Sequence, residues 1–409
     1  MRDSQDTAPG GGAIDRRAVL AGAAGVLLGV ELSRPAQGLA RAQSLEGVAA
    51  SGFDPVLARR LQRALDHAVA ASGGGIPGAI LHVERAGHST WTGSAGLARI
   101  APDAAMRPED RFPAGSIMKS FIAAAVLQLV ERGRLTLDAS LPTVLPGAVT
   151  DHFPGAAKIT VRMLLDHRSG LPDWSSPATD IAAVRQPGRV WKASDFLAVA
   201  AAKKPLFPPG ARYGYSNTNY TLLGLVIDHA AERGWRQQVT EGIIKRLALR
   251  ATVLPPPGDR SELRPYAHGY VEVNGRVVDA SSIDPSMAGA AGGFALVTTV
   301  RDLVRFLDAL LAGRLFRRRE TLQAMLTFKR APDPESPGQV GYGLGLIRRV
   351  LPGGVGTIDH YGGSVVYAAY VGRLPRQKVT FAAAVNGKIR AGQVVDASPL
   401  LFPVVQALS

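Results

Sequence analysis

The sequence predicts a mixed α/β fold in which one sheet is built from both ends of the chain, with a large and mostly helical segment inserted between its two parts. Three observations support this prediction. The early strand patterns are too few for a complete sheet, helical patterns fill the middle of the chain, and several strand patterns follow late. We expect the sheet portion at about 53–115 and 288–409 and the helical portion at about 116–287, within one domain over 43–409.

The sheet is expected to begin after a helix. Apolar residues recur at near-helical spacing over Pro55–Ala71, and strand patterns at Ala79–Arg85 and Ser89–Gly96 flank a short turn. The glycine-rich break at 72–78 matches the spacing G-x-G-x-x-G. Because this break contains Pro77 and leads from a helix into a strand, we interpret it as a loop and not as a dinucleotide site.

The inserted portion starts with a helix that is apolar on most of its sides. The run Phe121–Val130 follows Pro113 and Gly115, which are typical of a helix start, and Gly133 marks its end. Four further helices are expected before residue 288, at Val161–Asp166, Ala193–Ala201, Tyr220–Arg233 and Arg236–Leu247. We expect the rest of this portion to be loop.

The late part of the chain is expected to return to the sheet. A helix at Thr299–Ala312 leads toward four strand patterns, at Tyr342–Val350, Val355–Gly362, Val366–Leu374 and Lys378–Asn386. A last helix at about Val394–Leu408 closes the chain. The early and late strands are therefore expected to share one sheet.

The composition is that of a globular protein, with 46% hydrophobic and 20% charged residues in a chain of 409. The net charge of +14 is spread along the chain, and only Arg317-Arg318-Arg319 forms a basic run, so we expect no nucleic-acid partner. The chain has no cysteine, and its eight histidines are scattered without an H-E-x-x-H pattern. We therefore predict no disulfide, no metal site and no cofactor.

The N-terminus resembles a twin-arginine export signal. Asp15-Arg16-Arg17 precedes the apolar stretch Ala18–Val30, and Ala40-Arg41-Ala42 has the small residues of a cleavage site. The apolar stretch is too short to span a bilayer comfortably. We expect residues 1–42 to be removed and the mature chain to be periplasmic or extracellular, without a membrane span. An uncleaved anchor or a chance leader is the alternative.

Ser116 and Lys119 break a local rule at the start of the buried helix. Lys119 lies one turn after Ser116 on the same face, where a cation meets the positive end of the helix dipole and its stem enters apolar surroundings. A serine alcohol needs a neighbour that accepts its proton, and a lysine amine can accept it once burial has lowered its pKa. A helix cap followed by a lysine that reaches solvent is the simpler structural interpretation.

Two later stretches carry side chains suited to the same chemistry. Tyr215 and Asn217 lie in a loop before a helix, where a tyrosine can share a proton with a lysine and an amide can hold a substrate. His360 precedes Gly362 and Gly363 at the end of a strand, where glycine leaves room for a substrate and an N–H can face an oxyanion. Taken singly, these stretches are also explained as a helix cap, a packed aromatic ring or a structural histidine beside a turn.

In this order the stretches resemble the motifs of the penicillin-recognising serine hydrolases, which include class C β-lactamases, D-alanyl-D-alanine carboxypeptidases and esterase relatives. The motifs S-x-x-K, Y-x-N and H-x-G are represented by Ser116–Lys119, Tyr215–Asn217 and His360–Gly362. Further similarity occurs at 159–172, 219–224, 291–296 and 342–346, so the resemblance covers about 53–390. It implies an antiparallel sheet flanked by helices, of the β-lactamase and D,D-peptidase type.

The resemblance also implies roles for the first two motifs. Ser116 would be the acylated nucleophile and Lys119 its base or proton relay. Tyr215 would carry the proton to the leaving group and later activate water, and Asn217 would hold the substrate amide.

For the third motif, the resemblance places His360 where relatives have a cation or a hydrogen-bonding residue. The backbone amides of Ser116 and Gly363 would form the oxyanion hole. His167 belongs to a shared stretch outside this set, and we interpret it as structural.

Two departures from the family pattern concern substrate choice. The third motif has histidine in place of lysine, as in carboxypeptidase-type and broad hydrolase members, and Tyr361 replaces the small hydroxyl residue usual at its centre. Arg348 or Arg349 is a candidate to bind a substrate carboxylate, because strand alternation points only one of them toward the cleft.

We predict an exported serine hydrolase that acts through an acyl-enzyme, by D-alanyl-D-alanine carboxypeptidase-like peptide or amide hydrolysis, with an esterase or a β-lactamase as the alternatives. The expected partner is a small-molecule or peptide substrate, such as a peptidoglycan-type peptide, a β-lactam or an ester. No serine has the flanking glycines of G-x-S-x-G, which argues against a Ser-His-Asp hydrolase. A non-catalytic envelope-binding protein on the same fold is the alternative from another class.

Overall fold

The computed structural model describes residues 48–49, 52–85, 89–231, 233–261, 265–273, 275–390, 395 and 397–409. The export signal predicted at 1–42 lies outside these residues. Among the described helices, none has both the length and the apolar character needed to cross a membrane.

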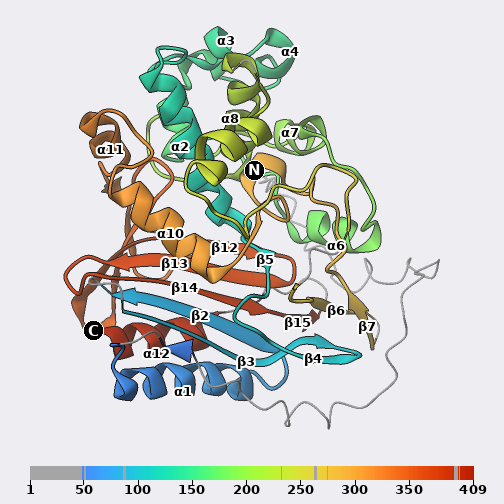
Figure 1. Cartoon of the computed structure of the whole chain (residues 1–409). Coiled ribbons are helices and arrows are strands. Elements are labelled where there is room, and N and C mark those ends of the chain that lie inside the picture. The colour runs from blue at the N-terminus through green and yellow to red at the C-terminus, as the bar shows by residue number, and fades with distance from the viewer. Residues whose placement is uncertain are drawn as a thin grey trace, which may run out of the picture. The chain divides into compact units, whose positions relative to one another are not determined.

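One large antiparallel sheet joins the two ends of the chain (Figure 1). Its strands lie in the order β1-β3-β2-β14-β13-β12-β11-β10-β9, and β4 pairs with β3. The early and late parts meet where β2 pairs with β14 along its whole length, from Gly78 opposite Asn386 to Arg85 opposite Val379. The prediction of one sheet built from both chain ends is therefore confirmed. The strands are β1 (Val48–Ala49), β2 (Gly78–Arg85), β3 (Thr90–Ile100), β4 (Asp103–Ala105), β9 (Lys329–Arg330), β10 (Gln339–Tyr342), β11 (Ile347–Leu351), β12 (Val355–Ser364), β13 (Tyr367–Leu374) and β14 (Val379–Asn386).

Helices cover both faces of this sheet. Helix α1 (Pro55–Ala71) packs on β2 and β3 and against α12 (Ser398–Leu408), which contacts β14. Helix α10 (Val300–Leu311) packs on β2, β13 and β14 from the other side (Figure 1). Aromatic stacking links α10 to the inserted portion, because the rings of Phe306 and Phe121 lie 3.6 Å apart between centroids. The buried faces of these helices and the sheet form the core.

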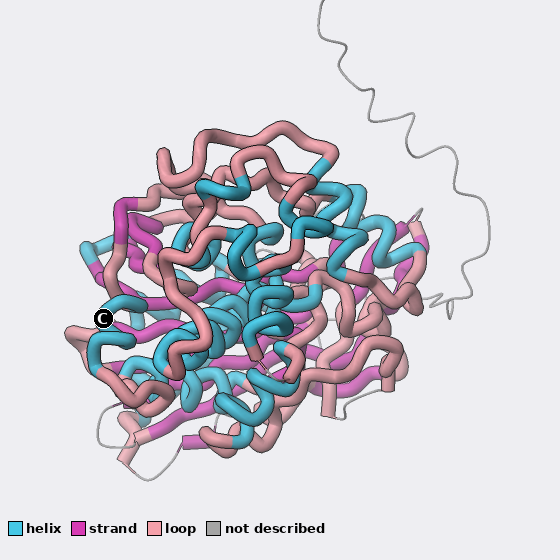
Figure 2. Tube along the Cα trace, turned by 90° about the horizontal axis from the view of Figure 1, so that it is seen from above, coloured by secondary structure: helices cyan, strands magenta, loops and turns pink. Residues whose placement is uncertain are grey.

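Seen from above, helices and loops lie over the strands (Figure 2), and the inserted portion contributes helices α2 to α9. Its central helix α2 (Met118–Glu131) is buried on nearly every side, as its apolar sequence predicts. The other helices are α3 (Leu141–Val144), α4 (Gly147–Thr150), α5 (Val161–Leu165), α6 (Pro177–Arg185), α7 (Ala193–Ala201), α8 (Asn217–Ala230) and α9 (Trp235–Val239), with α11 (Arg319–Met325) following α10. Helix α8 packs directly on α2, which brings the second motif beside the first.

Helices α3, α4 and α6 lie where only loop was expected, and two predictions about strands are wrong. Strands β6 (Tyr270–Val273) and β7 (Arg276–Asp279) lie in the portion expected to hold only helix and loop. They pair with each other, and β6 also pairs with β15 (Lys388–Arg390), in a separate sheet. Alternating valines around an Asn-Gly dipeptide are the hairpin signal there. The strand expected at Tyr342–Val350 is instead a hairpin of β10 and β11, because the chain turns at Gly345, whose φ is +79°.

Two short strands, β5 (Phe112–Pro113) and β8 (Val297–Thr298), pair with each other just before the first motif.

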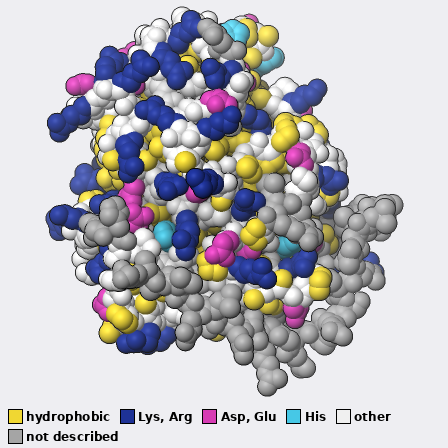
Figure 3. All heavy atoms as spheres, viewed as in Figure 1, with side chains coloured by type: hydrophobic (Ala, Val, Ile, Leu, Met, Phe, Trp, Pro, Cys, Tyr) yellow, Lys and Arg dark blue, Asp and Glu magenta, His cyan; other side chains and the backbone are white. Residues whose placement is uncertain are grey.

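On the face shown in Figure 3, Lys and Arg side chains are spread over the surface with Asp and Glu between them.

Candidate active site

Ser116 lies in the short 3-10 turn η3 (Gly115–Ile117) that leads into α2. This turn packs directly on β12, and two glycines allow that approach. A Cβ atom at Gly362 would lie 1.9 Å from the carbonyl oxygen of Ala114, and one at Gly115, whose φ is +55°, would lie 2.6 Å from the carbonyl oxygen of Gly363. Only glycine therefore fits at both positions. The first and third motifs meet at this contact.

The backbone amides predicted to bind an oxyanion lie on the two sides of this contact. A Cβ atom placed at Gly362 would lie 3.1 Å from the amide nitrogen of Ser116. A Cβ atom placed at Gly115 would lie 2.8 Å from the amide nitrogen of Gly363. The structure thus brings the amide nitrogens of Ser116 and Gly363 to the same contact between η3 and β12.

Lys119 is fully buried and its Nζ contacts three oxygen atoms. The distances are 2.8 Å to Ser116 Oγ, 2.8 Å to Asn217 Oδ1 and 2.5 Å to the carbonyl oxygen of Ala291. Ala291 belongs to a second 3-10 turn, η6 (Gly289–Ala291), which packs on α8. The first two motifs and η6 thus converge on one amine.

The chemistry of these partners decides what a neutral Lys119 does. The carbonyl oxygens of Asn217 and Ala291 only accept hydrogen bonds, whereas the Ser116 hydroxyl both donates and accepts. A neutral amine has two N–H groups and one lone pair. The two carbonyls take the N–H groups, so the lone pair points at the hydroxyl of Ser116, which is the arrangement of a general base with its nucleophile.

Burial favours the neutral form of this amine. It lowers the pKa of Lys119 from 10.5 to about 7, while the nearby charge of Asp173 acts in the opposite direction. A large fraction of Lys119 is therefore neutral near pH 7.

Tyr215 is partly buried beside Ser116, and its side chain is hydrogen-bonded to that serine. The Lys119 Nζ lies 5.0 Å from the centroid of the Tyr215 ring. Burial raises the pKa of Tyr215 well above 10, so the phenol keeps its proton at neutral pH. Of the two groups, Lys119 is suited to act as the base and Tyr215 as the acid.

His360 lies on β12 and is buried. Its Nδ1 lies 2.7 Å from the carbonyl oxygen of Tyr361, which only accepts, so Nδ1 carries the hydrogen. The Nε2 atom is then the acceptor for the Tyr342 hydroxyl at 3.1 Å. Burial and Lys119 lower the pKa of His360 to about 3, so this histidine is neutral and supplies no positive charge.

The two arginines considered for carboxylate binding have different environments. Arg348 is exposed on β11, whereas Arg349 is 4% exposed. The Arg349 guanidinium forms an ion pair with the buried Asp359 at 3.2 Å and donates to Ser336 Oγ and to the carbonyl oxygen of Pro337. Arg349 is therefore held by its own protein partners.

The comparisons with known proteins agree with this geometry. A family model described as Beta-lactamase matches residues 58–406. The chain belongs to the β-lactamase family. A D-stereospecific amidohydrolase from a Streptomyces species is 35% identical, with a TM-score of 0.72 over 84% of this chain and 97% of that one. The D-amino acid amidase of Ochrobactrum anthropi SV3, complexed with L-phenylalanine amide, is 26% identical, with a TM-score of 0.75 over 86% of this chain and 98% of that one.

Among curated proteins, Protein flp from Staphylococcus aureus is 25% identical over 189 residues, which are 46% of this chain. That match spans 37% of Protein flp, well under half of its length. Membership of the β-lactamase family, together with the amidase relatives, confirms the predicted resemblance and the predicted serine hydrolase.

His167 has a well-defined structural environment in this β-lactamase family member. Its backbone adopts φ +55°, which is unusual for a residue with a side chain. The Nδ1 atom accepts from the Ser216 N–H at 3.3 Å and from Asn219 Nδ2 at 2.9 Å, and the ring lies 4.3 Å from that of Tyr215. These contacts support the structural interpretation, because they hold the loop of the second motif in place.

Two residues of the site were not predicted from the sequence. Tyr342, which donates to His360, lies in a stretch noted for its family similarity, so that stretch was the available signal. Asp173, which contacts Asn217, follows immediately after the similar stretch 159–172 and had no signal of its own. In the described part of the chain, no three His, Cys, Asp or Glu side chains are grouped so that they could hold a metal ion.

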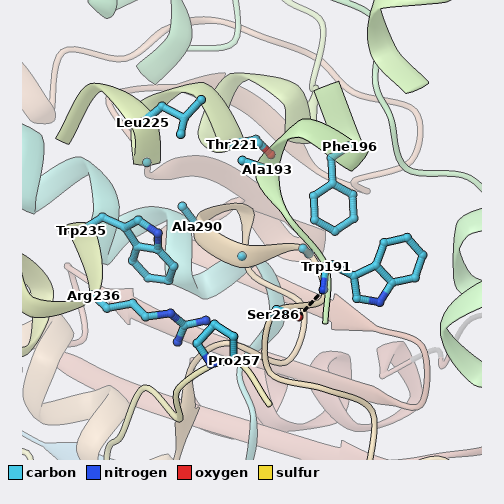
Figure 4. A pocket seen from close by; sticks show the side chains of 13 residues that line it. Trp191, Ala193, Phe196, Thr221, Leu225, Trp235, Arg236, Pro257, Ser286 and Ala290 are labelled. Atoms are coloured by element: carbon cyan, nitrogen blue, oxygen red, sulfur yellow. Dashed lines mark hydrogen bonds between the residues drawn. The ribbon is translucent and has the colours of Figure 1, made fainter. Parts of the chain in front are cut away.

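A separate hollow of about 100 Å³ lies beside α8 and η6 (Figure 4). Its wall includes the rings of Phe196 and Trp235 together with Ser286, which accepts from the Trp191 N–H at 2.7 Å. None of the predicted site residues lines it, so it is distinct from the contact region around Ser116.

Proposed function

We propose that this protein is an exported serine amidohydrolase that cleaves amides of D-amino acids through an acyl-enzyme on Ser116. The observation that carries the proposal is the orientation of Lys119. Its two N–H groups are taken by carbonyl oxygens and its lone pair faces the Ser116 hydroxyl. The pKa of Lys119 is about 7, so the amine can accept a proton at neutral pH.

In the acylation step, the Ser116 oxygen attacks the substrate carbonyl carbon while Lys119 takes the hydroxyl proton. The carbonyl oxygen becomes an oxyanion, which the amides of Ser116 and Gly363 stabilise. Tyr215 donates its proton to the leaving nitrogen, the C–N bond breaks, and Tyr215 is reprotonated by the proton that Lys119 took. The products of this step are an amine and an ester on Ser116.

In the deacylation step, water attacks the ester carbon and loses a proton to the Tyr215 and Lys119 pair. The C–O bond to Ser116 breaks and the serine oxygen regains a proton. A carboxylic acid leaves, and the site returns to its starting state with no net change in its protons.

The third motif supports a small and uncharged leaving group. A carboxypeptidase releases an amino acid whose carboxylate calls for a cation, but His360 is neutral and Arg349 is already paired with Asp359. Tyr361 adds bulk at the centre of the motif, and its ring lies 3.6 Å from the position of a Cβ at Gly363. A primary amide, which releases ammonia, fits this environment better. The two solved relatives, a D-stereospecific amidohydrolase and a D-amino acid amidase, support the same substrate class.

The proposal of export rests on the sequence. The pair Arg16-Arg17 before an apolar stretch is typical of a twin-arginine signal, and the chain has no cysteine that an oxidising compartment would affect.

The test is a substrate panel with the purified protein and with Ser116→Ala as the control. We expect ammonia from D-phenylalanine amide, much less from L-phenylalanine amide, and none from either in Ser116→Ala. Faster release of D-alanine from an acyl-D-alanyl-D-alanine peptide would show a carboxypeptidase and refute the uncharged leaving group. Rapid turnover of a penicillin or of an ester alone would favour the β-lactamase or esterase alternative, and no turnover of any substrate would favour a binding protein.

A further inference from the structure

We propose that Asp173 is a positioning residue that fixes the side-chain amide of Asn217 and thereby aims the lone pair of Lys119 at Ser116. This inference rests on the proposed role of Ser116 as the nucleophile. Asp173 lies between α5 and α6, directly after Pro172, and is partly exposed. It touches the second motif without being part of any motif.

Both carboxylate oxygens of Asp173 are engaged on the side of Asn217. Oδ1 accepts from the backbone N–H groups of Ser175 at 3.0 Å and Asn217 at 3.1 Å. Oδ2 accepts from Asn217 Nδ2 at 3.0 Å. Backbone and side chain of Asn217 are thus held by one carboxylate.

This contact settles which way the Asn217 amide points. An ionised carboxylate only accepts hydrogen bonds, so Asn217 must turn its Nδ2 toward Asp173. Its Oδ1 is then the atom that faces Lys119, at 2.8 Å. If the amide were reversed, Nδ2 would donate to the Lys119 lone pair and compete with the hydroxyl of Ser116. Asp173 prevents that competition.

Asp173 is also the charged group among the titratable groups facing Lys119. The others are His167 and His360, whose pKa values burial lowers, and Tyr215 and Tyr220, whose pKa values burial raises, so all four are neutral near pH 7. The charge of Asp173 raises the pKa of Lys119. Its removal should therefore move the acid limb of the pH–rate profile to lower pH.

The substitution Asp173→Asn tests the orientation with almost no change in volume. The introduced amide must keep its oxygen toward the N–H groups of Ser175 and Asn217, so its NH₂ group faces Asn217. Asn217 then reverses and offers a donor to Lys119. With p-nitrophenyl acetate, whose leaving group needs no proton, we expect kcat to fall about 100-fold and the acid limb to move down.

Two further variants separate positioning from support of the fold. Asp173→Ala leaves the Asn217 amide free to keep Oδ1 on Lys119, so we expect a smaller loss of kcat than in Asp173→Asn, with a larger loss of unfolding temperature. The double variant Asp173→Asn with Asn217→Asp restores an acceptor to Lys119. We expect it to recover kcat at least about tenfold over Asp173→Asn, with the acid limb moved to higher pH by the adjacent charge.

Asp180→Asn is the matched control. Asp180 is a partly buried carboxylate in the first turn of α6, close enough to Asp173 to feel its charge, and its substitution leaves the Asn217 contacts intact. We expect its kcat to stay within about twofold of wild type.

Two results would overturn the inference. One is a wild-type kcat in Asp173→Asn, and the other is a larger loss of kcat in Asp173→Ala than in Asp173→Asn without recovery in the double variant. Ester hydrolysis that persists in Ser116→Ala would refute the proposed nucleophile, and with it this inference. If Ser116→Ala is inactive and Asp173→Asn keeps its activity, the positioning role of Asp173 is refuted while Ser116 remains the nucleophile.

Discussion

Replacing Lys119 by methionine should change how the stability of the protein depends on pH. In the folded state burial holds the pKa of Lys119 at about 7, against 10.5 for an ordinary lysine. Between these values the unfolded chain holds a proton that the folded chain has released. The free energy of unfolding of the wild type therefore rises with pH in this window, by about 1.4 kcal/mol for each pH unit.

Methionine has a similar length and no titrating group, so Lys119→Met removes this dependence. The lost contacts to Asn217 and Ala291 add a constant difference that does not vary with pH. We expect the difference in unfolding free energy, wild type minus Lys119→Met, to increase by about 2 kcal/mol from pH 7 to pH 9, because the slope reaches its full value only above the folded-state pKa of about 7.

The assay is urea unfolding of both proteins at pH 7, 8 and 9, followed by tryptophan fluorescence and fitted with a common slope. Each protein must refold reversibly at every pH. A difference that is constant across the range would mean that Lys119 stays charged in the folded state, and it would refute the assignment of Lys119 as a neutral base.

Other predictions concern activity. The acid limb of kcat/KM should have its midpoint near pH 7, where Lys119 becomes neutral, and a limb several pH units higher would contradict that base. Tyr215→Phe should lower amide hydrolysis by about 100-fold or more and p-nitrophenyl ester hydrolysis much less, because only the amide needs a proton on its leaving group; equal losses would exclude the acid role. Gly362→Ala should lower kcat by about 100-fold, since its Cβ would lie 1.9 Å from the Ala114 carbonyl oxygen, and circular dichroism should show a folded protein.

Much of the fold follows from local patterns. Helix α2 is apolar almost throughout and is buried, and the late alternating strands β12 to β14 form the centre of the sheet. The two failures that concern strands come from short elements. The hairpin of β6 and β7 has only four residues in each strand, so neither strand stands out from a loop, and its Asn-Gly signal is a single dipeptide.

For the candidate site, the sequence by itself determined which residues meet within one helical turn. The spacing of Ser116 and Lys119 places them one turn apart, across the junction of η3 and α2, and the apolar run that follows ensures that the lysine is buried. Family motifs identified Tyr215, Asn217 and His360 because their order along the chain is itself informative.

Only the tertiary structure decided the protonation and the orientation of these groups. The acceptors of Lys119 lie 98 and 172 positions away in the sequence, and the partner of Arg349 lies on a neighbouring strand. Asp173, 44 positions before Asn217, sets the direction of its amide. A pKa and a hydrogen-bond direction depend on the burial and the partners that the fold supplies. A pattern along the chain therefore identifies the reactive groups, and their packing decides which of them carries the proton.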